Sequence, residues 1–245
     1  MTLTWNNSKI TKIDLSVTNF CNAGCPQCHR TNPNGLNTVD WLPLTSWSLD
    51  DFKRAFPTFK NINIIEFCGI WGDPIMAKDI FEICKYIIDN SDCKIEILTN
   101  GSIRDETWWW NLGVMCGNRL EVIFDIDGIT QEMHQQYRRK TNLQKILNNM
   151  ETLTSTFAKA KTFTVVFKHN EDYIEEIEKQ NKSHGAFFCE FVHSNRIFDE
   201  EDKFHYVDEN GEKQFLEKSY KKLPVTTWSC NCDICRPKKD FNDRV

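Results

Sequence analysis

The stretch Cys21-Asn-Ala-Gly-Cys25-Pro-Gln-Cys28 carries three cysteines, with three and then two residues between them, directly after the apolar run 13–17. Gly24 and Pro26 interrupt any helix, so the thiols are expected on a tight loop that can gather their sulfurs around one point. Such a loop binds metal. Three thiolates leave one position of a four-ligand site open, and His29 could fill it as a Cys3His zinc knuckle. Motifs elsewhere in the chain help to decide between this zinc site and another kind of metal site.

Three further motifs follow in order, each after an apolar run. They are Phe67-Cys68-Gly69-Ile70-Trp71-Gly72-Asp73-Pro74, then Leu98-Thr99-Asn100-Gly101, then Phe124-Asp125-Ile126-Asp127-Gly128 with His134, Tyr137 and Arg138. With Cys-x3-Cys-x2-Cys they resemble the radical S-adenosylmethionine (radical SAM) superfamily, and the last motif is similar to its SPASM and twitch subgroup. Asp73 stands where Glu is commoner in the family. The resemblance covers about residues 10–192 and weighs against the zinc knuckle.

Short β-rich runs alternate with helical patterns up to residue 192. Strands are expected at 12–17, 63–67, 94–98, 120–124, 163–167 and 186–192, and helices from 49 and at 78–89, 104–114, 143–153 and 170–182. Without hairpin signals between them, the strands should be parallel and joined by right-handed crossovers. The predicted fold is α/β, an open, partial (βα)6 TIM-like barrel over residues 1–192, as the resemblance also implies. Its chemistry should gather at the carboxyl ends of the strands.

Two features of the predicted helices concern packing. Trp108, Trp109 and Trp110 are consecutive, so they cannot share one helical face, and at least one should be exposed or at a contact. Cys84 falls on the apolar side of its helix and is expected in the core.

Residues 193–245 form a predicted C-terminal extension that is twitch-like. Asn210-Gly211 predicts the turn of a small hairpin. Cys230, Cys232 and Cys235 form a second triplet, which resembles the auxiliary iron–sulfur site of twitch-type enzymes. A zinc site and a redox-inert tail are the alternatives. Cys68 or Cys189 would complete a closed auxiliary [4Fe–4S] cluster; an open iron is the favoured interpretation.

Composition limits the class of protein. The net charge is −5 and the pI about 5.7, which disfavours nucleic acid because a polyanion needs a basic face. The chain has eleven cysteines, and its two cysteine clusters have metal spacing; with no apolar signal-peptide core, this indicates a reduced, cytoplasmic protein. No stretch approaches the roughly 20 apolar residues of a membrane span.

The resemblance implies a specific chemistry. Cys21, Cys25 and Cys28 would hold a [4Fe–4S] cluster whose open iron is chelated by S-adenosylmethionine. An electron, from an external donor such as a flavodoxin or ferredoxin, would cleave the cofactor to a 5′-deoxyadenosyl radical that abstracts hydrogen. The expected cofactor contacts are the methionyl ammonium at Gly72, Asp73 and Pro74, the ribose at Asn100 and Asp125 or Asp127, and the carboxylate at Arg138. Asn100-Gly101 and Asp127-Gly128 could instead be simple turns.

The substrate is not named by these motifs. A peptide or protein side chain is the preferred class, by analogy with SPASM and twitch proteins. Modification of a small metabolite or nucleotide is an alternative, as is a two-cluster electron-transfer or binding protein without radical chemistry. No further catalytic residue is assigned.

Overall fold

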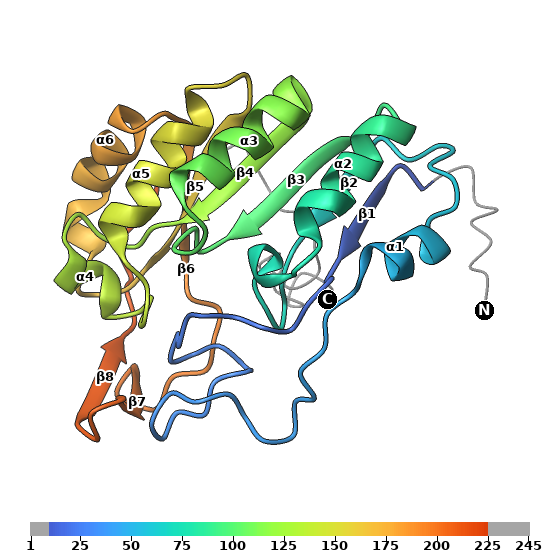
Figure 1. Cartoon of the computed structure of the whole chain (residues 1–245). Helices are drawn as coiled ribbons and strands as arrows, with labels where there is room; N and C mark the ends of the chain where they lie inside the picture. Colours follow the sequence, from blue (N-terminus) through green and yellow to red (C-terminus); the bar gives the residue numbers. More distant parts are fainter. Residues whose placement is uncertain (1–9, 225–245) are drawn as a thin grey trace, which may run out of the picture.

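The computed structural model describes residues 10–224. Six strands form one sheet in chain order, and every neighbouring pair is parallel. They are β1 (Lys12–Leu15), β2 (Ile64–Phe67), β3 (Lys94–Thr99), β4 (Leu120–Asp125), β5 (Lys159–Val166) and β6 (Ala186–His193). Helices α2, α3, α5 and α6 lie on one face of the curved sheet (Figure 1). The predicted partial (βα)6 barrel is confirmed.

The helices begin at side-chain caps that the sequence supplies. Ser48 and Asp51 form a capping box at the start of α1, and Asp105 and Asn142 accept backbone N–H bonds at the starts of α3 and α5. The bounds are α1 (Leu49–Ala55), α2 (Ile80–Asn90), α3 (Glu106–Cys116), α4 (Gln131–Gln135), α5 (Leu143–Thr154) and α6 (Ile174–Ser183), with short 3-10 helices η1 (Pro74–Met76), η2 (Gly117–Arg119) and η3 (Glu171–Tyr173).

The main hydrophobic core fills the space between the sheet and these helices. Ile65, Ile97 and Phe124 of the strands are fully buried in it, together with Trp109 of α3. Trp110 is 48% exposed, so the prediction that the three tryptophans cannot all be buried is confirmed. Cys84 is also in this core, as predicted.

Two element boundaries differ by four residues from their predictions: α6 begins at Ile174 and not at 170, after the 3-10 helix η3, and the start of β5 also differs. β5 begins at Lys159, four residues before the expected start at 163. The added residues include Lys161, which pairs with Glu121 inside the barrel at 2.5 Å. A lysine inside a barrel breaks the apolar pattern by which strands are recognised, because the partner that stabilises it lies on another strand.

The predicted hairpin is present as β7 (Lys203–Val207) and β8 (Lys213–Glu217), an antiparallel pair. It adjoins the loop that follows the three cysteines, because Val207 donates its N–H to Pro33 (2.7 Å) and accepts from Gly35 (2.9 Å). Figure 1 shows this contact at the carboxyl ends of the strands. The hairpin therefore packs against the cysteine loop and the segment that follows it.

Within residues 10–224, no helix is long and apolar enough to cross a membrane.

Candidate functional site

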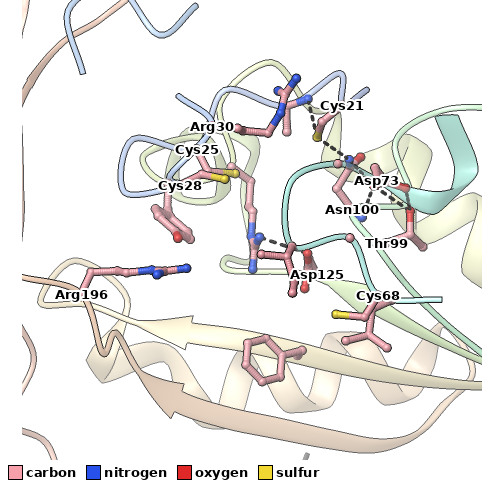
Figure 2. A pocket seen from close by; sticks show the side chains of 18 of the residues that line it. Cys21, Cys25, Cys28, Arg30, Cys68, Asp73, Thr99, Asn100, Asp125 and Arg196 are labelled. Atoms are coloured by element: carbon pink, nitrogen blue, oxygen red, sulfur yellow. Dashed lines mark hydrogen bonds and ion pairs between the residues drawn. The ribbon is translucent and has the colours of Figure 1, made fainter. Parts of the chain in front are cut away.

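A cavity of about 240 Å³ opens at the carboxyl ends of the parallel strands. Figure 2 shows the side chains around it, contributed by the cysteine loop, the loops after β2, β3 and β4, and the segment after β6. The lining includes Asp14, Cys21, Cys25, Cys28, Arg30, Cys68, Gly72, Asp73, Asn100, Asp125, Tyr137, Arg138, Phe163 and Arg196. Segments distant in the sequence therefore meet at one site.

The cysteine loop is fixed by backbone hydrogen bonds and by close packing. Cys28 donates its N–H to the carbonyl of Cys25 (3.0 Å), and Gly24 donates to the carbonyl of Arg139 (3.0 Å). The loop after β2 passes so close that a Cβ on Gly72 would lie 2.4 Å from the carbonyl oxygen of Thr18. Glycine is required at position 72 because main chain occupies the space of a side chain.

The three thiols line the cavity, and their arrangement can be compared with the ligands of a single metal ion and of an iron–sulfur cluster. Burial raises the pKa of Cys25 to about 12, and burial likewise raises that of Cys21. Within residues 10–224, no three His, Cys, Asp or Glu side chains converge closely enough to hold a single metal ion. In an iron–sulfur cluster each cysteine binds a different iron, so its thiols stand apart around a shared space. Three thiols around one cavity fit that donor set.

His29 does not complete a zinc site in this geometry. Its side chain is exposed and does not line the cavity. Its Nε2 lies 2.9 Å from Nη1 of Arg196, which is a hydrogen-bond donor. Partial desolvation, and then the charge of Arg196, lower the pKa of His29. His29 therefore supports Arg196 in this structure.

Asp73 anchors the loop after β2. Its carboxylate accepts hydrogen bonds from the N–H groups of Ile75 (3.0 Å) and Asn100 (2.8 Å), from the Thr99 hydroxyl (2.8 and 2.9 Å) and from the Asn100 amide. Only 4% of Asp73 is exposed. Asn100 also donates to the Asn22 side chain at 2.9 Å, and its amide lies 3.9 Å from the Cys21 sulfur. Asp73 and Asn100 thus connect the loops after β2 and β3 to the cysteine loop.

Arg138 is held by two carboxylates. Its Nη1 lies 3.0 Å from Asp125 and its Nε 2.6 Å from Asp127. Asp127 also accepts the N–H of Val165 at 2.7 Å. Burial raises the pKa of Asp125 to about 7, although Arg138 acts in the opposite direction. The site therefore contains a carboxyl group that can gain or lose a proton near neutral pH.

Most of the predicted contact residues lie at the cavity, and two do not. Gly72, Asp73, Asn100, Asp125 and Arg138 line it. Pro74 is buried at the start of η1 and does not line the cavity. Asp127 is fully buried behind Arg138, so in this geometry it orients the guanidinium and has no exposed oxygen for a ribose. In the sequence, this pairing is indicated only by Arg138 following Asp127 by eleven positions. That spacing does not show which of the two aspartates faces the cavity.

The sequence did not identify four charged or aromatic residues at the cavity. Asp14, Arg30, Phe163 and Arg196 line it and belong to no predicted motif. Asp14 also begins a row of acidic residues in register across the sheet, followed by Glu66, Glu96 and Glu121 on the next three strands. Lys12 contacts Glu66 (2.6 Å) and Glu96 (2.7 Å) inside the barrel. In the sequence these acidic residues appear one at a time within separate apolar runs, so their alignment in a row depends on the register of the strands.

The second cysteine triplet, Cys230, Cys232 and Cys235, lies outside the described residues. Of the two proposed additional ligands, Cys68 lines the cavity. Cys189 is in the main core, with its sulfur 4.0 Å from the carbonyl of Glu178 in α6. Cys189 therefore faces away from the cavity.

The class of protein is defined by a parallel, partial α/β barrel with three thiols lining a cavity at its carboxyl end. The family model of the radical SAM superfamily matches residues 15–180, more than half of the chain. The chain belongs to the radical SAM superfamily, and the family resemblance seen in its motifs is confirmed.

The chain is similar to relatives whose activities differ from one another. A GTP 3′,8-cyclase of Nautilia profundicola is 24% identical over 198 residues, covering 78% of this chain and 59% of the relative. A cysteine-type anaerobic sulfatase-maturating enzyme of Clostridium novyi is 26% identical over 184 residues, covering 70% and 48%. The chain thus spans about half the length of the curated relatives it matches.

Solved structures show the same fold. Streptococcus suis SuiB bound to S-adenosylmethionine matches with a TM-score of 0.63 at 11% identity, covering 78% of this chain and 42% of SuiB. SuiB bound to the precursor peptide SuiA gives a TM-score of 0.61 at 12% identity, covering 76% and 40%. At these identities the likeness concerns the fold alone.

Proposed function

We propose that this chain binds a [4Fe–4S] cluster and S-adenosylmethionine, cleaves the cofactor reductively and abstracts hydrogen from a peptide or protein side chain. The observation that carries the proposal is one cavity lined by Cys21, Cys25 and Cys28 together with Asn100 and Arg138. An electron-transfer protein has no need for a cavity with polar side chains beside its cluster. A small external electron donor, such as a flavodoxin or ferredoxin, is part of this proposal.

When bound, the cluster and S-adenosylmethionine supply the one-electron chemistry. The chain's own residues bind, orient and enclose them. The three thiols hold iron, and Gly72 lets the loop after β2 pack directly against the main chain that leads into the cysteine loop. Asn100 and Asp125 present polar groups for the ribose, and Arg138 presents a guanidinium oriented by Asp127 for the carboxylate. Tyr137 and Phe163 line the cavity with rings that exclude water.

Two features of the site support a peptide substrate. Apolar side chains stand exposed in the loops at this end of the barrel, with Phe20 at 37%, Ile70 at 40% and Trp41 at 62%. Exposed aromatic and aliphatic groups beside a cavity suit a polypeptide. Asp14 and Asp125 line the cavity as well as its arginines, so the wall is not the uniformly basic surface that suits a polyphosphate.

A second candidate function is the modification of a nucleotide or other small metabolite. It is favoured by the similarity of GTP 3′,8-cyclases to this chain. The two candidates differ in substrate and share the same cofactor chemistry, so one assay addresses both.

The experiment is anaerobic reconstitution with iron and sulfide, followed by measurement of 5′-deoxyadenosine under reducing conditions. We expect 5′-deoxyadenosine from the loaded protein, and its rate should increase with a peptide substrate and not with GTP. Intact clusters that yield no 5′-deoxyadenosine with any candidate would support electron transfer instead. Stimulation by GTP alone would replace the peptide with the nucleotide.

The auxiliary cluster is a further part of the proposal, carried by Cys230, Cys232 and Cys235. A variant with all three loop cysteines replaced by Ala should retain about four irons, the content of one such cluster. Cys189→Ala on that background should leave the count unchanged because its sulfur faces α6. Cys68→Ala should also leave it unchanged if the auxiliary iron is open. Zinc in place of iron would exclude the auxiliary cluster, and iron loss in either variant would identify a fourth ligand.

A further inference from the structure

Three arginines line the cavity, and their partners differ. Arg138 is paired with Asp125 and Asp127. Arg30 is 5% exposed and donates to the carbonyls of Trp71 (3.0 Å) and Asn19 (3.3 Å) and to the Thr38 hydroxyl (3.1 Å). Arg196 has no carboxylate within ion-pair distance in the described part of the chain. Its guanidinium contacts Nε2 of His29 at 2.9 Å.

Arg196 is held in a fixed place relative to the cysteine loop. Ser194 donates its hydroxyl hydrogen to the Gln27 side chain at 2.7 Å and accepts the backbone N–H of Arg196 at 3.3 Å. The His29 contact fixes the other end of the side chain. Gln27 and His29 flank Cys28, so the segment after β6 is tied to the loop that carries the thiols. Figure 2 shows Arg196 entering the site on the side of Cys25 and Cys28.

The contact to His29 orients the guanidinium and leaves most of its donors available. A guanidinium has five N–H donors in a planar fork, and an imidazole nitrogen accepts one of them. An imidazole acceptor also adds no negative charge of its own. A cationic fork at a cavity wall, oriented but not neutralised, matches the geometry of a carboxylate.

The geometry points to Arg196 as the residue that recognises a carboxylate on the substrate, which makes an acidic peptide the favoured substrate class. This inference rests on the proposed function and names its substrate more closely. One guanidinium balances one carboxylate, whereas a nucleoside triphosphate carries several negative charges. The other two arginines of the cavity already have partners, because Arg138 is paired with two carboxylates and Arg30 donates to backbone carbonyls. The fixed distance between Arg196 and the cysteine loop would hold a bound peptide in one register at the site of hydrogen abstraction.

The test uses two blocked pentapeptides that differ at the central residue, glutamate or glutamine. Their binding to the reconstituted protein, saturated with S-adenosylmethionine, is measured by anaerobic calorimetry. We expect the glutamate peptide to bind at least about tenfold more tightly, as a charge-assisted hydrogen bond provides. Arg196→Gln should remove this preference, and Arg196→Lys should restore part of it because the charge returns without the fork. Arg54→Gln, at an exposed arginine on α1, is the matched control and should keep the full preference.

Each contrary outcome overturns the inference. Equal affinity for the two peptides, or no binding of the glutamate peptide, removes carboxylate recognition. Arg196-dependent binding of GTP or inorganic phosphate, without the glutamate preference, assigns the residue to a phosphate. Loss of S-adenosylmethionine binding in Arg196→Gln, equal to the loss of peptide binding, assigns it to the cofactor. Because calorimetry needs no turnover, a retained preference without 5′-deoxyadenosine would refute the proposed function and leave Arg196 as a carboxylate-binding residue.

Discussion

Replacing Asp73 with alanine should destabilise the whole protein, beyond any effect on cofactor binding. The carboxylate accepts the backbone N–H groups of Ile75 and Asn100 and bonds of the Thr99 and Asn100 side chains, all in a region shielded from water. Alanine would leave these donors without an acceptor. An unsatisfied buried donor costs about 1–3 kcal/mol.

Leaving the two backbone N–H groups unsatisfied would therefore cost about 2–6 kcal/mol of stability. Burial raises the pKa of Asp73, so its removal also relieves a cost of burying charge and places the net loss near the lower end. We therefore expect a loss of about 2–3 kcal/mol in the free energy of unfolding. For a chain of this length that lowers the Tm by roughly 5 °C or more.

The assay is anaerobic thermal unfolding, followed by tryptophan fluorescence, with S-adenosylmethionine binding measured in parallel. Asp73→Asn should fall between the wild type and Asp73→Ala, since one oxygen can still accept from Ile75 and Thr99. Asp89→Ala is the matched control, because its exposed pair with Lys85 contributes at most about 0.5 kcal/mol. Unchanged stability of Asp73→Ala with lost cofactor binding would refute the role as a loop anchor.

Three more predictions concern the cluster, the barrel interior and the core. Replacing Cys21, Cys25 or Cys28 singly by Ala should abolish cleavage of S-adenosylmethionine and lower the iron count. Full cleavage activity in one of these variants would show that its cysteine is not a cluster ligand. Burial raises the pKa of Glu66 to about 7, so the folded protein holds a proton that the unfolded chain releases near pH 4.5, and stability falls as pH rises between these values. Glu66→Gln should flatten that fall, by at most about 3 kcal/mol; parallel Tm-against-pH curves would contradict the shift. Trp109→Ala should lower the free energy of unfolding by about 3–5 kcal/mol, and Trp110→Ala should lower it much less because Trp110 is partly exposed. Equal losses in the two variants would contradict this dependence on burial.

Sequence reasoning succeeded where the physical signal is local. The spacing of the three cysteines and the turn at Asn210-Gly211 each depend on residues a few positions apart. Apolar runs of β-branched residues predicted the six strands, and the absence of hairpin turns predicted that they are parallel. The sequence could also locate Asp125 and Arg138 after strand four, because chain order alone brings loops after parallel strands to one end of the barrel.

Tertiary structure decided which of these side chains face the cavity and which support them. Asp125 and Asp127 are two positions apart, yet one lines the cavity and the other is buried behind Arg138, because the path of the chain after β4 sets where each side chain points. Lys161 and Arg196 carried no local signal, since the groups that give them a role lie on other strands and loops. Contacts between distant segments depend on packing of the whole barrel, and no short window of sequence contains that information.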